Sequence, residues 1–167
     1  GVRTIFNMLG PLTNPAGATA QLLGVYDPKL VEMFAGVLKN MGTKRAFVVH
    51  GHDGLDEVTV SGETRVAELN DGLIRTYNIN PHDYIGSAYP LEMIRGGDPA
   101  ANAQILKDVL SGRQGACRDA VLMNAALAIV AGEKAADIKE GISVAADCID
   151  SGRAMEKLQA LVQMSNN

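Results

Sequence analysis

The sequence has no tryptophan, only two cysteines and few aromatic residues, and these shortages exclude several classes of protein. Cys117 and Cys148 lie far apart, and neither has a cysteine or histidine close by in the sequence. A disulfide framework or a zinc site is therefore not indicated, and we interpret both as reduced cytosolic thiols. The longest apolar run, residues 125–131, is much shorter than the roughly 20 residues of a membrane-spanning helix. This excludes a transmembrane protein.

Positive charge is also scarce, with 15 Lys and Arg against 19 Asp and Glu, a net charge of −4 and no basic block. Binding to nucleic acid through a broad electrostatic patch is therefore not expected. The 167 residues, 47% of them hydrophobic, suit one domain with its own core, which we predict to span residues 1–167. The sequence begins Gly1-Val2-Arg3, without Met or a signal peptide, and we interpret it as a fragment.

The first half of the sequence has the pattern of a βαβ unit. Residues 20–26 and 45–50 are short apolar runs, which predicts two buried strands. Between them, Asp27-Pro28 has the form of a helix start, and Gly42 is placed where a helix ends. Two strands joined by a helix are expected to be parallel, with a right-handed crossover.

Antiparallel strands and then helices are predicted to follow. The turn signals Ser61-Gly62 and Asn70-Asp71-Gly72 separate three runs expected to be strands, residues 57–61, 64–69 and 73–79. Four helices are predicted after them, one beginning at Asp98-Pro99 and three over residues 118–131, 135–151 and 153–164. The predicted fold class is α/β, a mixed β-sheet flanked by helices.

An acidic pair ends the segment His50-Gly51-His52-Asp53-Gly54-Leu55-Asp56-Glu57, which follows a predicted buried strand. Ligands of open α/β sheets bind beyond the carboxyl ends of the strands. Adjacent carboxylates in a straight strand point to opposite faces, but at a turn Asp56 and Glu57 can serve one site. Two oxygen ligands suit a Mg²⁺ ion that is shared with substrate phosphates. The alternative is a polar loop whose acids are merely solvated.

An uncharged loop precedes the first strand, with the sequence Asn7-Met8-Leu9-Gly10-Pro11-Leu12-Thr13-Asn14-Pro15. A rigid loop without charge can form one wall of a pocket for a flat, apolar ligand. The alternative is a structural loop whose Asn side chains satisfy the backbone of turns. Taken alone, the residues do not decide between these two interpretations.

Two other features favour structural roles. His50 and His52 lack the spacing of a metal-binding motif, so hydrogen bonding within the loop is favoured over catalysis or metal binding. Gly96-Gly97-Asp98 precedes a helix and could hold a phosphate on free N–H groups. However, Asp98 would place a carboxylate where that anion binds, so a helix cap is the favoured interpretation.

Four segments together resemble anthranilate phosphoribosyltransferases: FNMLGPLTNP at residues 6–15, QLLGVY at 21–26, the loop ending in GLDE at 54–57, and RDAVLMNAA at 118–126. The resemblance implies transfer of phosphoribose from phosphoribosyl pyrophosphate to the amine of anthranilate, with release of pyrophosphate, in tryptophan biosynthesis. It also implies a cytoplasmic, Mg²⁺-dependent glycosyltransferase of the nucleoside phosphorylase-like fold. In that fold a small helical domain joins a large α/β domain, and the full-length protein is expected to dimerise through the helical domain.

The resemblance assigns roles to four residues of this sequence. Asp56 and Glu57 match the Mg²⁺-binding pair of the family, while Gly10 and Pro11 match the loop that lines the anthranilate channel. No residue is assigned to covalent or acid–base catalysis. The family's helical domain, its GTGGD pyrophosphate loop and its anthranilate-binding arginine, which is not Arg3, would all precede this sequence. We therefore expect the sequence to be part of the large catalytic domain, folded but inactive alone.

Three alternatives compete with this interpretation. A nucleoside phosphorylase-like relative would share the fold but should lack the Asp-Glu pair and the uncharged Gly-Pro loop. A paralogue of the same fold that binds nucleic acid would need a basic surface, and the net charge of −4 argues against one. A purely structural, truncated domain would have no activity at all.

Overall fold

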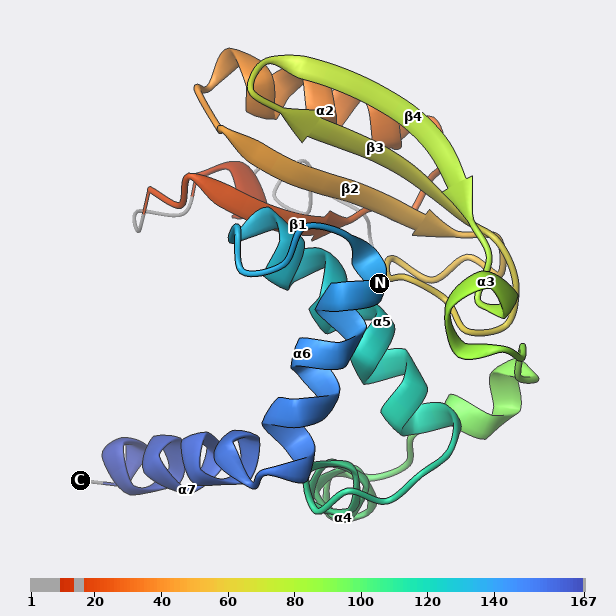
Figure 1. Cartoon of the computed structure of the whole chain (residues 1–167), viewed down its shortest axis with the longest axis vertical. Helices are drawn as coiled ribbons and strands as arrows, with labels where there is room; N and C mark the ends of the chain where they lie inside the picture. The colour runs from red at the N-terminus through yellow and green to blue at the C-terminus, as the bar shows by residue number, and fades with distance from the viewer. Residues whose placement is uncertain (1–9, 14–16, 167) are drawn as a thin grey trace.

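The centre of the protein is a four-stranded mixed sheet, seen in a computed structural model that describes residues 10–13 and 17–166 (Figure 1). The strands lie in the order β1 (Ala20–Gly24), β2 (Arg45–Gly51), β3 (Thr64–Asn70) and β4 (Leu73–Ile79). β1 and β2 are parallel, whereas β3 and β4 continue the sheet in antiparallel pairs. The predicted α/β class with a mixed sheet is confirmed.

Helices cover both faces of this sheet, with α2 on one side and α5 on the other (Figure 1). The helices are α2 (Leu30–Asn40), α3 (His82–Ile85), α4 (Pro99–Leu110), α5 (Ala116–Ala131), α6 (Ile138–Asp150) and α7 (Arg153–Ser165), with the 3-10 turns η1 (Gly10–Leu12) and η2 (Leu91–Ile94). The four helices predicted after Asp98 are all present. No helix within residues 10–13 and 17–166 is long and apolar enough to cross a membrane.

The sheet separates two apolar layers of the core, which meet at β2, and a third buried cluster joins α4, α5 and α6. Val48 packs in the layer under α2, while Phe47 and Val49 pack in the layer under α5. Successive side chains of a strand alternate between the two faces of a sheet, so a strand covered on both sides is apolar throughout. This explains why residues 46–49 form an unbroken apolar run.

The predicted βαβ unit forms, with its helix two residues shorter at the start. The Asp27 carboxylate accepts a hydrogen bond from the Lys29 N–H at 2.9 Å, and α2 begins only at Leu30. Gly42 has a φ of +83°, and the N–H of the next residue bonds back to the Leu38 carbonyl at 3.0 Å. This left-handed turn is the glycine helix end that the sequence predicts.

The prediction of a strand over residues 57–61 is wrong. This segment is an irregular loop, although Val58 and Val60 within it are fully buried. The backbone of Val58 pairs with a helix side chain, and the Thr59 N–H donates to the Thr64 hydroxyl at 3.0 Å. Because side chains form hydrogen bonds with these backbone groups, the segment cannot pair with β3 as a strand. Ser61-Gly62 is therefore not a hairpin turn.

The second predicted turn is correct. Asp71 and Gly72 join β3 to β4 with φ values of 45° and 81°. Two central residues with positive φ define the turn type that best joins two twisted antiparallel strands. The glycine is required here because other residues rarely adopt this conformation.

Candidate metal and substrate site

The acidic pair lies where the sequence places it, beyond the carboxyl ends of the parallel strands. β1 ends at Gly24 and β2 ends at Gly51, and both Asp56 and Glu57 belong to the loop that follows β2. Both residues are exposed to solvent. This edge of the sheet is where open α/β folds bind their ligands.

The end of β1 sets the position of Asp56 through direct backbone contact. A Cβ atom added to Gly24 would lie 1.5 Å from the carbonyl oxygen of Asp56 and 2.4 Å from its carbonyl carbon. No residue with a side chain can occupy position 24 while the loop keeps this path. The close approach therefore fixes the backbone of the acidic pair against the end of β1.

Helix α5 holds the loop on the other side of the acidic pair. The Asn124 side-chain oxygen accepts from the Val58 N–H at 2.9 Å, and its NH₂ group donates to the Val58 carbonyl at 2.9 Å. The same NH₂ group donates to the Ala120 carbonyl at 2.9 Å, which orients the amide. Because Val58 directly follows Glu57 and is buried, this clamp fixes the chain as it leaves the acidic pair.

A third set of contacts stabilises the start of the loop that follows β2. One carboxylate oxygen of Asp53 accepts hydrogen bonds from the hydroxyls of Thr59 and Ser61, each at 2.5 Å. Burial raises the pKa of the Asp53 carboxyl, but these hydrogen bonds outweigh it, so the pKa lies below its usual value. Asp53 is therefore a charged structural group at neutral pH, and it ties the two sides of the loop together.

Asp56 and Glu57 themselves are left without protein partners. Across residues 10–13 and 17–166, no hydrogen bond or ion pair reaches either carboxylate. No cluster of three or more His, Cys, Asp or Glu in that part of the chain could hold a metal. Two exposed carboxylates on a fixed backbone fit Mg²⁺, which keeps several waters or phosphate oxygens in its coordination shell.

His50 has the structural role that the sequence favours, whereas the His52 ring has no hydrogen-bond partner among the described residues. His50 is buried, and its Nδ1 donates to the Val25 carbonyl at 2.7 Å, which joins the end of β2 to the residue after β1. The His52 ring lies against Gly62, where an added Cβ would collide with it. Asp98 is the predicted helix cap, because its carboxylate accepts from the Ala101 N–H at 2.8 Å.

The uncharged loop is only partly described, since residues 7–9 and 14–15, like Arg3, lie outside the described residues. Gly10 and Pro11 form the turn η1 with Leu12, and Gly10 is exposed. Leu12 lines a cavity of about 400 Å³ together with Thr19 and Thr43, which precede β1 and β2. Leu12 also packs against the core layer that includes Leu23 and Val25, and the residues that line this cavity do not include the acidic pair.

A different cavity adjoins the acidic loop. It has a volume of about 320 Å³ and lies between Leu55, the residue before Asp56, and the segment around η2, including Ile94 and Arg95. This volume is in the range of pockets for small molecules. Leu55, Leu91 and Ile94 give this cavity apolar surface, and Glu92 and Arg95 add charged groups, so an organic substrate can lie here beside the acidic loop.

Three residues that build this site were not found by sequence analysis: Gly24, Asp53 and Asn124. The signal for Asn124 was a single amide within the apolar run of residues 121–127, because a polar group in such a run usually has a buried partner. Gly24 had a weaker signal, a glycine inside a strand pattern, which often marks close backbone approach. Nothing in the sequence singled out Asp53 from the acids around it.

The fold and the position of this site define a class of protein. The chain belongs to the glycosyl transferase family: the model of that family's a/b domain matches residues 1–155. The chain is 53% identical, over its whole length, to the anthranilate phosphoribosyltransferase of Desulfosudis oleivorans, and 54% identical over 99% of its length to that of Syntrophobacter fumaroxidans. It spans 50% and 49% of these two relatives, about half of their length.

Solved structures give the same result. The anthranilate phosphoribosyltransferase of Thermus thermophilus matches the whole chain with a TM-score of 0.89 and 40% identity, over 49% of its own length. The enzyme of Saccharomyces cerevisiae, in complex with phosphoribosyl pyrophosphate and Mg, matches 95% of the chain with a TM-score of 0.84 and 33% identity. That match covers 46% of the yeast protein, and another structure of the yeast enzyme holds 4-fluoroanthranilate.

Proposed function

We propose that this chain is part of the catalytic α/β domain of an anthranilate phosphoribosyltransferase, and that it contributes the Mg²⁺-binding carboxylates. The whole protein would transfer phosphoribose from phosphoribosyl pyrophosphate to anthranilate and release pyrophosphate, as a step of tryptophan biosynthesis. The observation that carries this proposal is the acidic pair, exposed and unpaired on a loop that Gly24 and Asn124 fix. The relatives that match the chain at 53% and 54% identity support the choice of reaction.

The role of the carboxylates follows from the charge that the reaction moves. When bound, Mg²⁺ offsets the negative charge that develops on the departing pyrophosphate. Asp56 and Glu57 would hold that ion at a fixed place, and the fastened loop avoids the cost of reorganising its backbone during the reaction. The attacking amine of anthranilate needs positioning more than activation.

Gly10 and Pro11 are proposed to line the site of the aromatic substrate. They are uncharged and cannot hold pyrophosphate by charge, and the support for their role is the sequence motif to which they belong. The cavity that the neighbouring Leu12 lines does not include Asp56 or Glu57 among its lining residues. The proposal is therefore tested separately from that of the carboxylates.

The substitution Gly10→Asp is expected to raise the KM for anthranilate on the order of tenfold, with little change for phosphoribosyl pyrophosphate. Among the described residues, none has an atom within 4 Å of a Cβ built on Gly10, so the variant should fold normally. Steady-state kinetics of the whole protein with each substrate varied gives both constants, and Ala100→Asp, at an exposed position of α4, is the control. Equal losses for both substrates would argue against this assignment.

The proposal extends to the partners and the location of the whole protein. Its partners would be its two small-molecule substrates, without nucleic acid or membrane, and it would act in the cytoplasm. Dimerisation would take place through a helical domain outside this sequence. A nucleoside phosphorylase-like relative and a nucleic-acid-binding paralogue are not favoured, because the relatives that match the chain are anthranilate phosphoribosyltransferases.

The proposed function is tested by following the loss of anthranilate fluorescence with phosphoribosyl pyrophosphate present. We expect the whole protein to consume anthranilate only when Mg²⁺ is added, and the 167-residue chain alone to be inactive. Inactivity is expected because two exposed carboxylates hold a strongly hydrated ion weakly without a cradle for the pyrophosphate. Turnover by the chain alone would show that the catalytic groups all lie within these residues. Failure of the whole protein to consume anthranilate would refute the proposed reaction.

A further inference from the structure

A third cavity, whose lining residues do not include the acidic loop, is rich in arginine. It has a volume of about 310 Å³ and lies between the end of α4, the start of α5 and the residues around η2. Arg95, Arg113 and Arg118 line it, and Asp108 is the one acidic residue among its lining residues. Because the whole sequence carries a net charge of −4, a cluster of three cations around one cavity is a local exception.

Arg118 forms the buried part of this wall. Its side chain is only 4% exposed, and its Nη2 donates to the Asp150 carboxylate at 2.8 Å. Its Nη1 is buried and has no hydrogen-bond partner among the described residues. Asp150 is 55% exposed, so solvent screens the one carboxylate that offsets this charge. The guanidinium therefore gives the cavity a positive charge that the protein only partly compensates.

The first turn of α5 adds backbone donors to the same cavity. The helix has 16 residues, and the residue before it, Gly115, provides no side-chain cap. Among the described residues, the N–H groups of Ala116, Cys117 and Arg118 have no acceptor, and all three residues line the cavity. Free N–H groups at the start of a helix bind anions, most strongly phosphates. Asp119 does not line the cavity, and it accepts a hydrogen bond from the Tyr89 hydroxyl at 2.6 Å.

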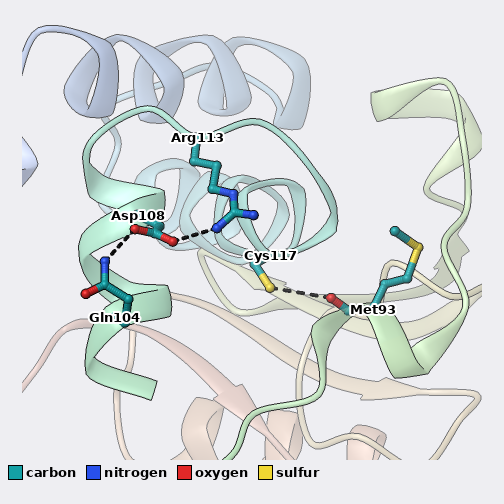
Figure 2. A network of polar contacts seen from close by, with 5 residues as sticks. All are labelled: Met93, Gln104, Asp108, Arg113 and Cys117. Carbon is teal, nitrogen blue, oxygen red and sulfur yellow. Dashed lines mark hydrogen bonds and ion pairs between the residues drawn. The ribbon is translucent and has the colours of Figure 1, made fainter. Parts of the chain in front are cut away.

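The single acid of the cavity is already neutralised. Figure 2 shows that Asp108 accepts from Arg113 at 2.6 Å and from the Gln104 amide at 2.7 Å, so neither of its oxygens is left unpaired. The Cys117 thiol donates to the Met93 carbonyl at 3.5 Å and ties the start of α5 to η2. The exposed Arg95 guanidinium has no partner in the described part of the chain. Repulsion from Asp108 is thus small, and Arg95 is free to contact a ligand.

We propose that this cavity binds a small phosphate-bearing anion, with the phosphate at the start of α5 between Arg95 and Arg113. The α5 N–H groups would bind the phosphate oxygens, and the buried positive charge of Arg118 in the cavity wall would attract the phosphate further. The cavity has room for an organic group beyond the phosphate, and Ile105 and Val109 provide apolar surface for it. The ligand is therefore a phosphate monoester, and neither Asp56 nor Glu57 is among the residues that line this cavity.

The test is a titration of the ¹⁵N-labelled whole protein, followed by the amide NMR signals of residues 116–118. The probes are inorganic phosphate and glycerol 3-phosphate, at low salt and with a chelator present so that no metal links phosphate to Asp56 and Glu57. The variant is Arg95→Gln combined with Arg113→Gln. Both residues are exposed, and the Arg113–Asp108 ion pair is a surface pair whose loss costs little stability. Arg75→Gln, an exposed arginine on β4, is the control for charge.

We expect saturable shifts of these three amide signals, with a dissociation constant on the order of tenfold or more higher in the double variant and unchanged in the control. Tighter binding of glycerol 3-phosphate than of phosphate would identify a monoester as the ligand. Equal binding would assign the site to free phosphate and overturn the monoester part of the proposal. An absence of saturable shifts, or equal binding by the double variant, would overturn the site. The proposed transferase activity is judged separately, from Mg²⁺-dependent consumption of anthranilate by the unmodified protein, because Arg95 also lines the cavity beside the acidic loop.

Discussion

Replacing Asp56 by Asn and Glu57 by Gln together is expected to lower the kcat/KM of the whole protein for phosphoribosyl pyrophosphate by roughly a thousandfold. The two carboxylates are the proposed protein ligands of the Mg²⁺ ion, and metal stabilisation of developing charge is worth several kcal/mol. The remaining activity should need more Mg²⁺ than the unmodified protein needs. Stability should change little, because both side chains are exposed and have no partner in the described part of the chain.

The matched control replaces two other exposed acids, Asp147→Asn and Glu156→Gln, on α6 and α7. It makes the same change of net charge far from the carboxyl end of β2, so it separates loss of the metal ligands from loss of charge. Kinetics are measured over a range of Mg²⁺ concentrations, and the free energy of unfolding is measured for each variant. Normal kinetics at low Mg²⁺ in the Asp56 and Glu57 double variant would show that the metal binds elsewhere.

The substitution Gly24→Ala is expected to have the second large effect, although it adds only one methyl group. Its Cβ would lie 1.5 Å from the Asp56 carbonyl oxygen, so β1 and the acidic loop cannot both keep their positions. Overpacking of this kind costs about 3 kcal/mol of stability, and here it also displaces the backbone of Asp56. We expect a lower free energy of unfolding together with a higher Mg²⁺ requirement for activity.

Gly36→Ala is the matched control for this prediction. Gly36 lies inside α2, and nothing is within 4 Å of a Cβ built there. Alanine should stabilise the protein at this position by about 0.5–1 kcal/mol, because glycine is unfavourable in a helix interior. Denaturant unfolding measures both variants. If Gly24→Ala unfolded like the unmodified protein and kept its Mg²⁺ dependence, the contact between β1 and the loop would not position the acidic pair.

The sequence predicted those parts of the fold that depend on local signals. Asp98 and Gly42 mark a helix start and a helix end, and the structure has both. The Asn70-Asp71-Gly72 turn was also predictable, because positive φ values at its two central residues favour few amino acids. In each case residues that are neighbours in the sequence determine the backbone conformation, and contacts with distant residues are not needed.

The errors arose where contacts between distant residues decide the structure. Residues 57–61 have the alternation of a strand, but the Asn124 amide takes the backbone groups of Val58 that a ladder would need. Asn124 is 66 positions along the chain from Val58, and no local sequence pattern predicts the hydrogen bonds between them. The contact between Gly24 and the backbone of Asp56 also joins residues that are distant in the sequence.

In the candidate site, too, features with a local sequence signal were predicted, and features that depend on distant contacts were not. The acidic pair was visible because two carboxylates after a buried strand form a local pattern with a clear chemical meaning. The residues that position this pair are Gly24, Asp53 and Asn124. Their contacts are found only in the three-dimensional structure. The arginine cavity likewise combines Arg95, Arg113 and Arg118 from the segments around η2 and the start of α5, and the sequence gives no reason to group them.

The central claim, that Asp56 and Glu57 bind the metal ion, is tested most directly by electron–nuclear double resonance with Mn²⁺ in place of Mg²⁺. The whole protein is labelled with ¹³C at the side-chain carboxyl groups of Asp and Glu and is measured with phosphoribosyl pyrophosphate present. We predict ¹³C couplings from directly bound carboxylate in the unmodified protein and their loss in the Asp56→Asn, Glu57→Gln variant. Couplings that persist unchanged in the variant, or that are absent from the unmodified protein, would contradict the claim.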